Sequence, residues 1–63
     1  MTQKELLYVE DAISHEDIII SNIKDYINCL EESEIVDFYQ KELKTHEKIK
    51  KDLFNLLEDE SND

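Results

Sequence analysis

Apolar residues in the first half of the chain recur at alternating spacings of three and four. This spacing keeps one side of an α-helix apolar along its length, because an α-helix completes a turn in about 3.6 residues. We therefore predict a helix over roughly residues 3–31, which Thr2 and Glu5 would start with a capping box. The predicted stripe is Leu6, Val9, Ile13, Glu16, Ile20, Ile23, Ile27 and Leu30.

The pattern breaks after Leu30, where the polar run Glu31–Glu34 begins. A turn at about residues 32–33 is predicted here, with Ser33 as the N-cap of a second helix over roughly residues 34–57. An antiparallel pairing about this turn would place Asp17 near Lys48. The second predicted stripe is Ile35, Tyr39, Glu42, His46, Ile49, Leu53 and Leu56.

These elements predict an all-α fold, an antiparallel two-helix hairpin. One continuous helix in a long coiled coil stays open as an alternative, because the chain has no glycine to end the first helix. After Leu57 the chain is almost entirely acidic and polar, and residues 58–63 are predicted to be a disordered tail.

The apolar surface is too wide for a single neighbouring helix. Three consecutive isoleucines, at 18–20, span about 200° of the helix circumference at about 100° per residue. A second neighbour is needed, and two hairpins packed as a homodimeric four-helix bundle supply it most simply. The residues expected to make this contact are Tyr8, Ala12, Ile19 and Tyr26 on the first helix and Phe38, Phe54 and Leu57 on the second.

Charge and composition restrict the classes of partner that the chain can bind. The chain has 63 residues and a net charge of −10, which would be repelled by nucleic acid and by anionic lipid. We expect no nucleic acid and no membrane as partner, but a second copy of the chain or another protein. A single cysteine, Cys29, and the absence of a signal-peptide pattern favour the cytoplasm.

The chemically interesting residues are polar members of the stripes. Glu16, Glu42 and His46 stand where apolar residues are expected, with His15 beside them. We interpret Glu16 and His46 as a buried pair, about 4.5 Å apart along the helix axis, with Glu42 about 10 Å from Glu16 and turned toward solvent. The alternative is a site for iron, manganese or zinc built from all four residues. No catalytic arrangement of residues is found, so we do not predict an enzyme.

Several features resemble a known family. The two arms of about 30 residues, the turn Glu32–Ile35, Phe38–Tyr39 and the run Thr45–Lys48 are similar to half of a ferritin-like bundle, in particular to the small spore coat proteins of the coat-F type. The resemblance covers roughly residues 6–57. It implies a structural or interaction protein of a spore-forming bacterium.

The sequence therefore predicts a small non-catalytic structural or interaction module that acts as a homodimeric bundle. Two alternatives stay open. One is a ferritin-like metal-binding protein, and the other is a small acidic regulator that offers its apolar face to a protein target.

Overall fold

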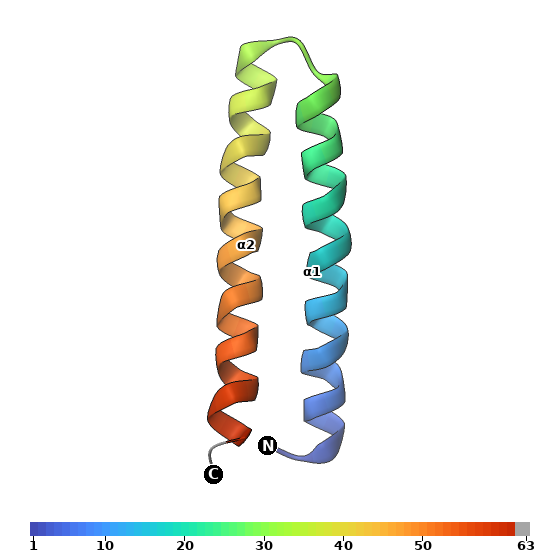
Figure 1. Cartoon of the computed structure of the whole chain (residues 1–63), viewed down its shortest axis with the longest axis vertical. Coiled ribbons are helices and arrows are strands. Elements are labelled where there is room, and N and C mark those ends of the chain that lie inside the picture. Colours follow the sequence, from blue (N-terminus) through green and yellow to red (C-terminus); the bar gives the residue numbers. More distant parts are fainter. Residues whose placement is uncertain (62–63) are drawn as a thin grey trace.

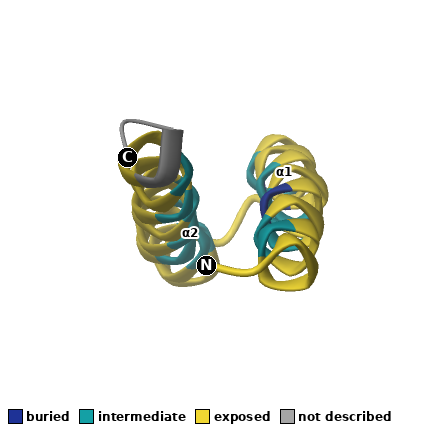
Figure 2. Ribbon diagram, turned by 90° about the horizontal axis from the view of Figure 1, so that it is seen from below, coloured by how far each residue is buried: buried dark blue, intermediate teal, exposed yellow. Residues whose placement is uncertain are grey.

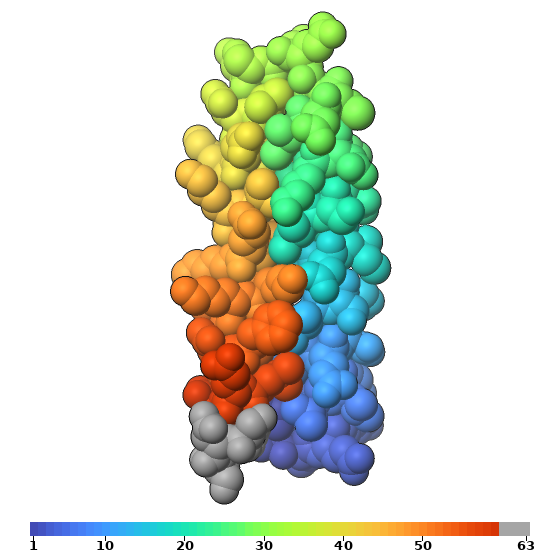
Figure 3. Space-filling model, viewed as in Figure 1, coloured from blue at the N-terminus to red at the C-terminus, as the bar shows by residue number. Residues whose placement is uncertain are grey.

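The computed structural model describes residues 1–61, and it consists of two antiparallel helices (Figure 1). Helix α1 spans Gln3–Cys29 and helix α2 spans Ser33–Ser61. The helices lie side by side in a rod about 47 Å long, and their side chains meet along its length (Figure 3). The predicted all-α hairpin is confirmed, and the alternative of one continuous helix is wrong.

The start of α1 is fixed by the predicted capping box. The backbone N–H of Glu5 donates to the Thr2 hydroxyl oxygen at 3.1 Å, and the backbone N–H of Thr2 donates to the Glu5 carboxylate at 2.7 Å. The hydrogen bond from the Thr2 backbone N–H to the carboxylate, with a smaller contribution from the Thr2 side chain, holds the pKa of Glu5 below its usual value of 4.5. The box satisfies two backbone donors that the first turn of a helix would otherwise leave without partners.

This cap gives a pH-dependent prediction. Because the pKa of Glu5 is lowered by folding, its contribution is present above about pH 4.5 and is lost as the pH falls through the lower folded value. Glu5→Ala should therefore lower the melting temperature at neutral pH but not at about pH 2. Thr2→Ala should cost about 1 kcal/mol and keep part of its effect in acid, because the bond from the Glu5 N–H carries no titrating group. Circular dichroism melts at the two pH values test this, and an undiminished effect of Glu5→Ala in acid would contradict it.

The turn between the helices needs no glycine. Leu30 ends α1 in an extended conformation, with φ −92° and ψ 143°, and its N–H donates to the carbonyl of Tyr26 at 3.0 Å. The carbonyl of Glu32 accepts from the N–H of Val36 at 3.0 Å, so Glu32 takes the N-cap position that was predicted for Ser33. No described residue has a positive φ. The predicted turn at residues 32–33 lies instead at residues 30–32, because α1 already ends at Cys29 and Glu32 is the N-cap of α2.

The second helix is longer than predicted. It continues through residues 58–61, where a disordered tail was expected. Once a helix is nucleated, each further residue adds a hydrogen bond, and no glycine or proline is present to stop it. The rest of the predicted tail, residues 62–63, lies outside the described residues.

The helices bury only the sides that face each other (Figure 2). We call these facing residues the seam. In α1 and its cap the seam matches the predicted stripe at all eight positions, Leu6 to Leu30. Ile13 and Ile23, at 8% and 6% exposure, are the buried apolar residues of this seam.

The predicted stripe of α2 is partly wrong. Ile35, Ile49 and Leu56 are exposed, and the residue that follows each of them is turned toward α1 instead. At Ile35 and Leu56 the sequence is ambiguous, because the residue that follows is also apolar. At the third place the seam residue is Lys50, whose aliphatic stem can pack against α1 while its ammonium group extends toward solvent. The observed seam of α2 is Val36, Tyr39, Leu43, His46, Lys50, Leu53 and Leu57.

Within the described residues, neither helix contains a stretch that is long and apolar enough to cross a membrane.

Candidate functional site

A polar contact crosses the seam halfway along the rod. His46 Nδ1 on α2 lies 2.6 Å from Glu16 Oε2 on α1, and the two side chains are 21% and 13% exposed. An ionised carboxylate only accepts hydrogen bonds, so Nδ1 carries the proton and donates it to Glu16. The predicted pairing of Glu16 with His46 is confirmed.

Glu42 also reaches His46, on the other side of the ring. Its Oε2 lies 3.7 Å from His46 Nε2, one helical turn away on α2, and its side chain is 41% exposed. The expected exposure of Glu42 to solvent is confirmed, but the expectation that it stands apart from the pair is wrong. That expectation came from the distance between Glu42 and Glu16 along the axis and overlooked the four-residue spacing between Glu42 and His46. We call Glu16, His46 and Glu42 the polar cluster.

The predicted metal residues are only partly brought together. His15 is exposed, one residue before Glu16, and it makes no described contact with the polar cluster. Among the described residues, no three histidine, cysteine or acidic side chains are grouped closely enough to hold a metal ion. Both ring nitrogens of His46 face carboxylates, so its ring bridges Glu16 and Glu42 in this structure.

An ion pair joins the two helices on the flank of the seam opposite Glu42. Asp17 of α1 pairs with Lys50 of α2, whereas Lys48, the partner predicted for Asp17, pairs with Asp52 on its own helix at 2.8 Å. The reason is that Lys50 occupies the seam, from which its ammonium group reaches Asp17, while Lys48 is exposed. The pairing thus follows the observed seam of α2.

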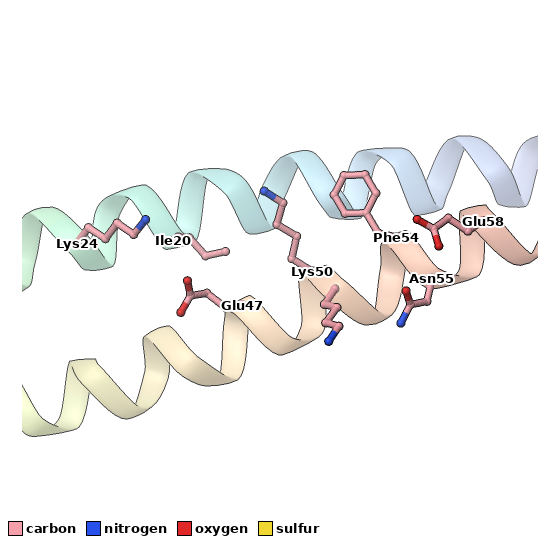
Figure 4. Close-up of a pocket in the computed structure, with 8 residues that line it drawn as sticks. Ile20, Lys24, Glu47, Lys50, Phe54, Asn55 and Glu58 are labelled. Atoms are coloured by element: carbon pink, nitrogen blue, oxygen red, sulfur yellow. The ribbon is translucent and has the colours of Figure 1, made fainter.

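A shallow pocket lies on this flank of the hairpin. It is lined by Lys24 and Ile20 of α1 and, on α2, by Glu47, Lys50 and Phe54 among others (Figure 4). The Lys50 and Phe54 side chains extend from α2 toward α1, and the Lys50 nitrogen lies 5.8 Å from the centre of the Phe54 ring. We call this flank the charged groove, because both signs of charge line it.

The opposite flank is apolar. In an antiparallel helix pair, the residue just before each seam residue lies on the same side of the hairpin in both helices. On α1 such residues precede Ile13, Ile20 and Ile27, and on α2 they precede Val36 and Lys50. These positions, and the neighbouring positions on the same side that lie farther from the seam, carry few charges. We define the apolar face by its residues, Tyr8, Ala12, Ile19 and Tyr26 on α1 and Ile35, Phe38, Ile49 and Leu56 on α2.

Aromatic contacts tie the two helices together near the turn. The rings of Tyr26 and Tyr39 are 5.4 Å apart, and those of Phe38 and Tyr39 are 5.2 Å apart. The four residues predicted for this surface on α1 lie on the apolar face, and so does Phe38 of α2. The prediction is wrong for the other two residues of α2, because Phe54 lies in the charged groove and Leu57 lies in the seam.

The fold and the site define a class of protein, a two-helix hairpin with one apolar face and a polar cluster beneath it. No protein-family model, no curated protein and no solved structure matches the chain. The resemblance to the coat-F proteins therefore stays a prediction.

Proposed function

We propose that the protein is a non-catalytic structural or interaction module that acts as a homodimeric four-helix bundle. The observation that carries the proposal is the exposure of large apolar side chains on both helices. Tyr26, Phe38 and Leu56 are 48%, 56% and 47% exposed, while the described core contains only Ile13 and Ile23 as buried residues. A short chain with so small a core needs a further source of stability, and a large exposed apolar patch marks a contact site.

The size of the apolar face supports a second copy as its partner. A rod 47 Å long and two helix diameters wide, about 20 Å, presents about 900 Å² on one side. A standard interface removes about 800 Å² from each partner. Two hairpins that met through this face would therefore bury an area sufficient for a stable dimer.

Charge placement supports the same partner. The net charge of −10 lies mostly outside the apolar face, whose own rows contain Glu42 near the middle, Asp52 in its ion pair with Lys48, and Glu5 at one end. Two copies could meet through this face without bringing their acidic surfaces together. The cytoplasm suits this module, because the exposed thiol of Cys29 would stay reduced there.

The chemistry of the polar cluster favours a non-catalytic role. His46 donates its Nδ1 proton to Glu16, and its Nε2 faces the Glu42 carboxylate at 3.7 Å. Among the described residues no three potential metal ligands are grouped together, and no nucleophile is paired with this ring.

Native mass spectrometry and sedimentation velocity of the protein purified without chelator test the proposal. We expect a metal-free dimer. A folded monomer at micromolar concentration would contradict it. A dimer that carries iron, manganese or zinc would favour the metal-binding alternative, and a partly unfolded monomer would favour the acidic regulator.

A further inference from the structure

Positive charge gathers in the charged groove, although the chain as a whole is acidic. Three of the seven basic residues line its pocket, Lys24, Lys50 and Lys51, together with the acidic residues Glu47 and Glu58. Positive side chains therefore outnumber negative ones in this lining, whereas the whole chain carries a net charge of −10. The local excess of ammonium groups favours an anion over a cation at this place.

Two of these lysines are available to a ligand. Lys50 is engaged, because it pairs with Asp17 and its nitrogen lies 5.8 Å from the centre of the Phe54 ring. Lys24 and Lys51 are exposed, and neither makes an ion pair or a ring contact within the part of the chain that the structure describes. Lys24 belongs to α1 and Lys51 to α2, so a ligand held by both would bridge the two helices.

An apolar surface lies beside these ammonium groups. Ile20 is half-buried, and Phe54 extends from α2 toward α1 with 44% of its surface exposed (Figure 4). An aromatic ring of a ligand could cover this exposed surface, because aromatic rings pack favourably on one another in offset or edge-to-face arrangements. The pocket has a volume of about 520 Å³, which is within the range of small-molecule sites.

The acidic residues of the lining limit the size of the ligand. Glu47 and Glu58 are about three helical turns apart on α2, roughly 16 Å along its axis. Lys50, Lys51 and Phe54 lie between them in the sequence. An anion in the middle of the pocket would stay near the lysines, whereas a long acidic segment would meet both carboxylates and be repelled. The arrangement therefore fits a compact ligand with one acidic group.

We propose that the charged groove binds a small organic anion that carries an aromatic ring. The ring packs against Phe54 and Ile20, and the acidic group is held by the ammonium groups of Lys24 and Lys51. The groove lies on the flank opposite the apolar face, so a second copy that covers that face leaves the groove open. The inference therefore does not rest on the proposed homodimer.

Proton–nitrogen correlation NMR of the full chain at neutral pH tests the proposal with three probes. Naphthalene sulfonate has both the ring and the charge, naphthalene methanol has only the ring, and methanesulfonate has only the charge. We expect a Kd on the order of 1 mM for naphthalene sulfonate, the value for about 14 non-hydrogen atoms at the binding efficiency of drug-sized ligands. The largest shift changes should fall at Lys24, Lys51 and Phe54. Each of the other probes should bind at least about threefold more weakly.

Substitutions in the pocket should change this affinity with a sign that follows the charge. Lys24→Gln and Lys51→Gln should each raise the Kd of naphthalene sulfonate about two- to fivefold, and Glu47→Gln should lower it by a similar factor. Phe54→Leu keeps an apolar side chain but removes the ring, so it should raise the Kd about two- to tenfold. Circular dichroism shows whether these variants keep their helices.

Lys48→Gln and Phe38→Leu are the matched controls. Lys48 is exposed and pairs with a residue of its own helix, and Phe38 lies on the apolar face, so both variants should keep the Kd of the unmodified chain. Equal losses of affinity in Lys48→Gln and Lys51→Gln would overturn the proposal, as would equal binding of naphthalene sulfonate and naphthalene methanol. Shift changes centred on Tyr26 and Phe38 would place the probe on the apolar face and overturn it as well. The absence of saturable shift changes would have the same meaning.

Discussion

Ile49→Glu is expected to separate the dimer. Ile49 lies on the apolar face and is 38% exposed in the hairpin, so a partner can cover the part of its surface that the chain itself leaves open. Ile49→Glu loses this contact and also brings a carboxylate without a partner into the interface, which costs about 1–3 kcal/mol and more for a charged group, and a twofold interface contains the residue twice. The dissociation constant should therefore rise roughly 10²–10⁴-fold, at about 1.4 kcal/mol for each factor of ten.

Ile18→Glu is the matched control for this variant. It makes the same chemical change on the outward side of α1, where Ile18 is 58% exposed and does not belong to the apolar face. We expect this variant to dimerise as the unmodified chain does. Sedimentation velocity at a series of concentrations measures both, and an equal loss of dimer in the two variants would show that the apolar face is not the interface.

The second large effect concerns the polar cluster. Replacing His46 alone should lower the free energy of unfolding, whereas replacing all three residues of the cluster should raise it. In His46→Leu the Glu16 carboxylate, only 13% exposed, loses the partner 2.6 Å away. Leaving a buried polar group without its hydrogen bond costs about 1–3 kcal/mol. The single substitution should therefore lower the free energy of unfolding.

Replacing the whole cluster should have the opposite effect. With leucine at Glu16, Glu42 and His46 together, no carboxylate of the polar cluster is left without a partner, and Lys50 remains as the charged residue of the seam. Exchanging a buried ion pair for apolar residues of similar volume is often neutral or stabilising by about 1–4 kcal/mol. We expect the triple variant to be more stable than the unmodified chain.

Urea unfolding at a fixed protein concentration measures these changes, because the stability of a dimer depends on concentration. Lys48→Leu with Asp52→Leu removes an exposed ion pair on α2 and serves as a control that should change stability by only about 0–1 kcal/mol. A single His46→Leu variant that is more stable than the unmodified chain would show that Glu16 needs no partner.

The sequence predicts α1 well because eight stripe positions from Leu6 to Leu30 follow one another at spacings of three and four, and the capping box marks the start. This long run decides the stripe even though Ile18–Ile20 are consecutive apolar residues. In α2 the adjacent pairs Ile35–Val36 and Leu56–Leu57 allow two stripes, and only packing against α1 decides between them.

The contact between Glu16 and His46 follows from their places in the stripes and the length of the turn. The contact between Glu42 and His46 could be predicted from their spacing of four residues on one helix. The distance between Glu42 and Glu16 along the helix axis did not indicate it, because that distance does not describe how far the side chains reach. The place of Lys50 in the seam could not be predicted, because a charged residue there is favourable only when Asp17 lies opposite.

The start of α1 and the end of α2 lie at the same end of the rod, and the turn lies at the other (Figure 1). A segment or a tag attached to either terminus would therefore be held about 47 Å from the turn. If two copies pack with their turns at the same end, all four attachment points are clustered there, and the assembly is a one-ended anchor. If the turns lie at opposite ends, two attachment points project from each end, and the assembly is a rigid spacer between whatever it joins.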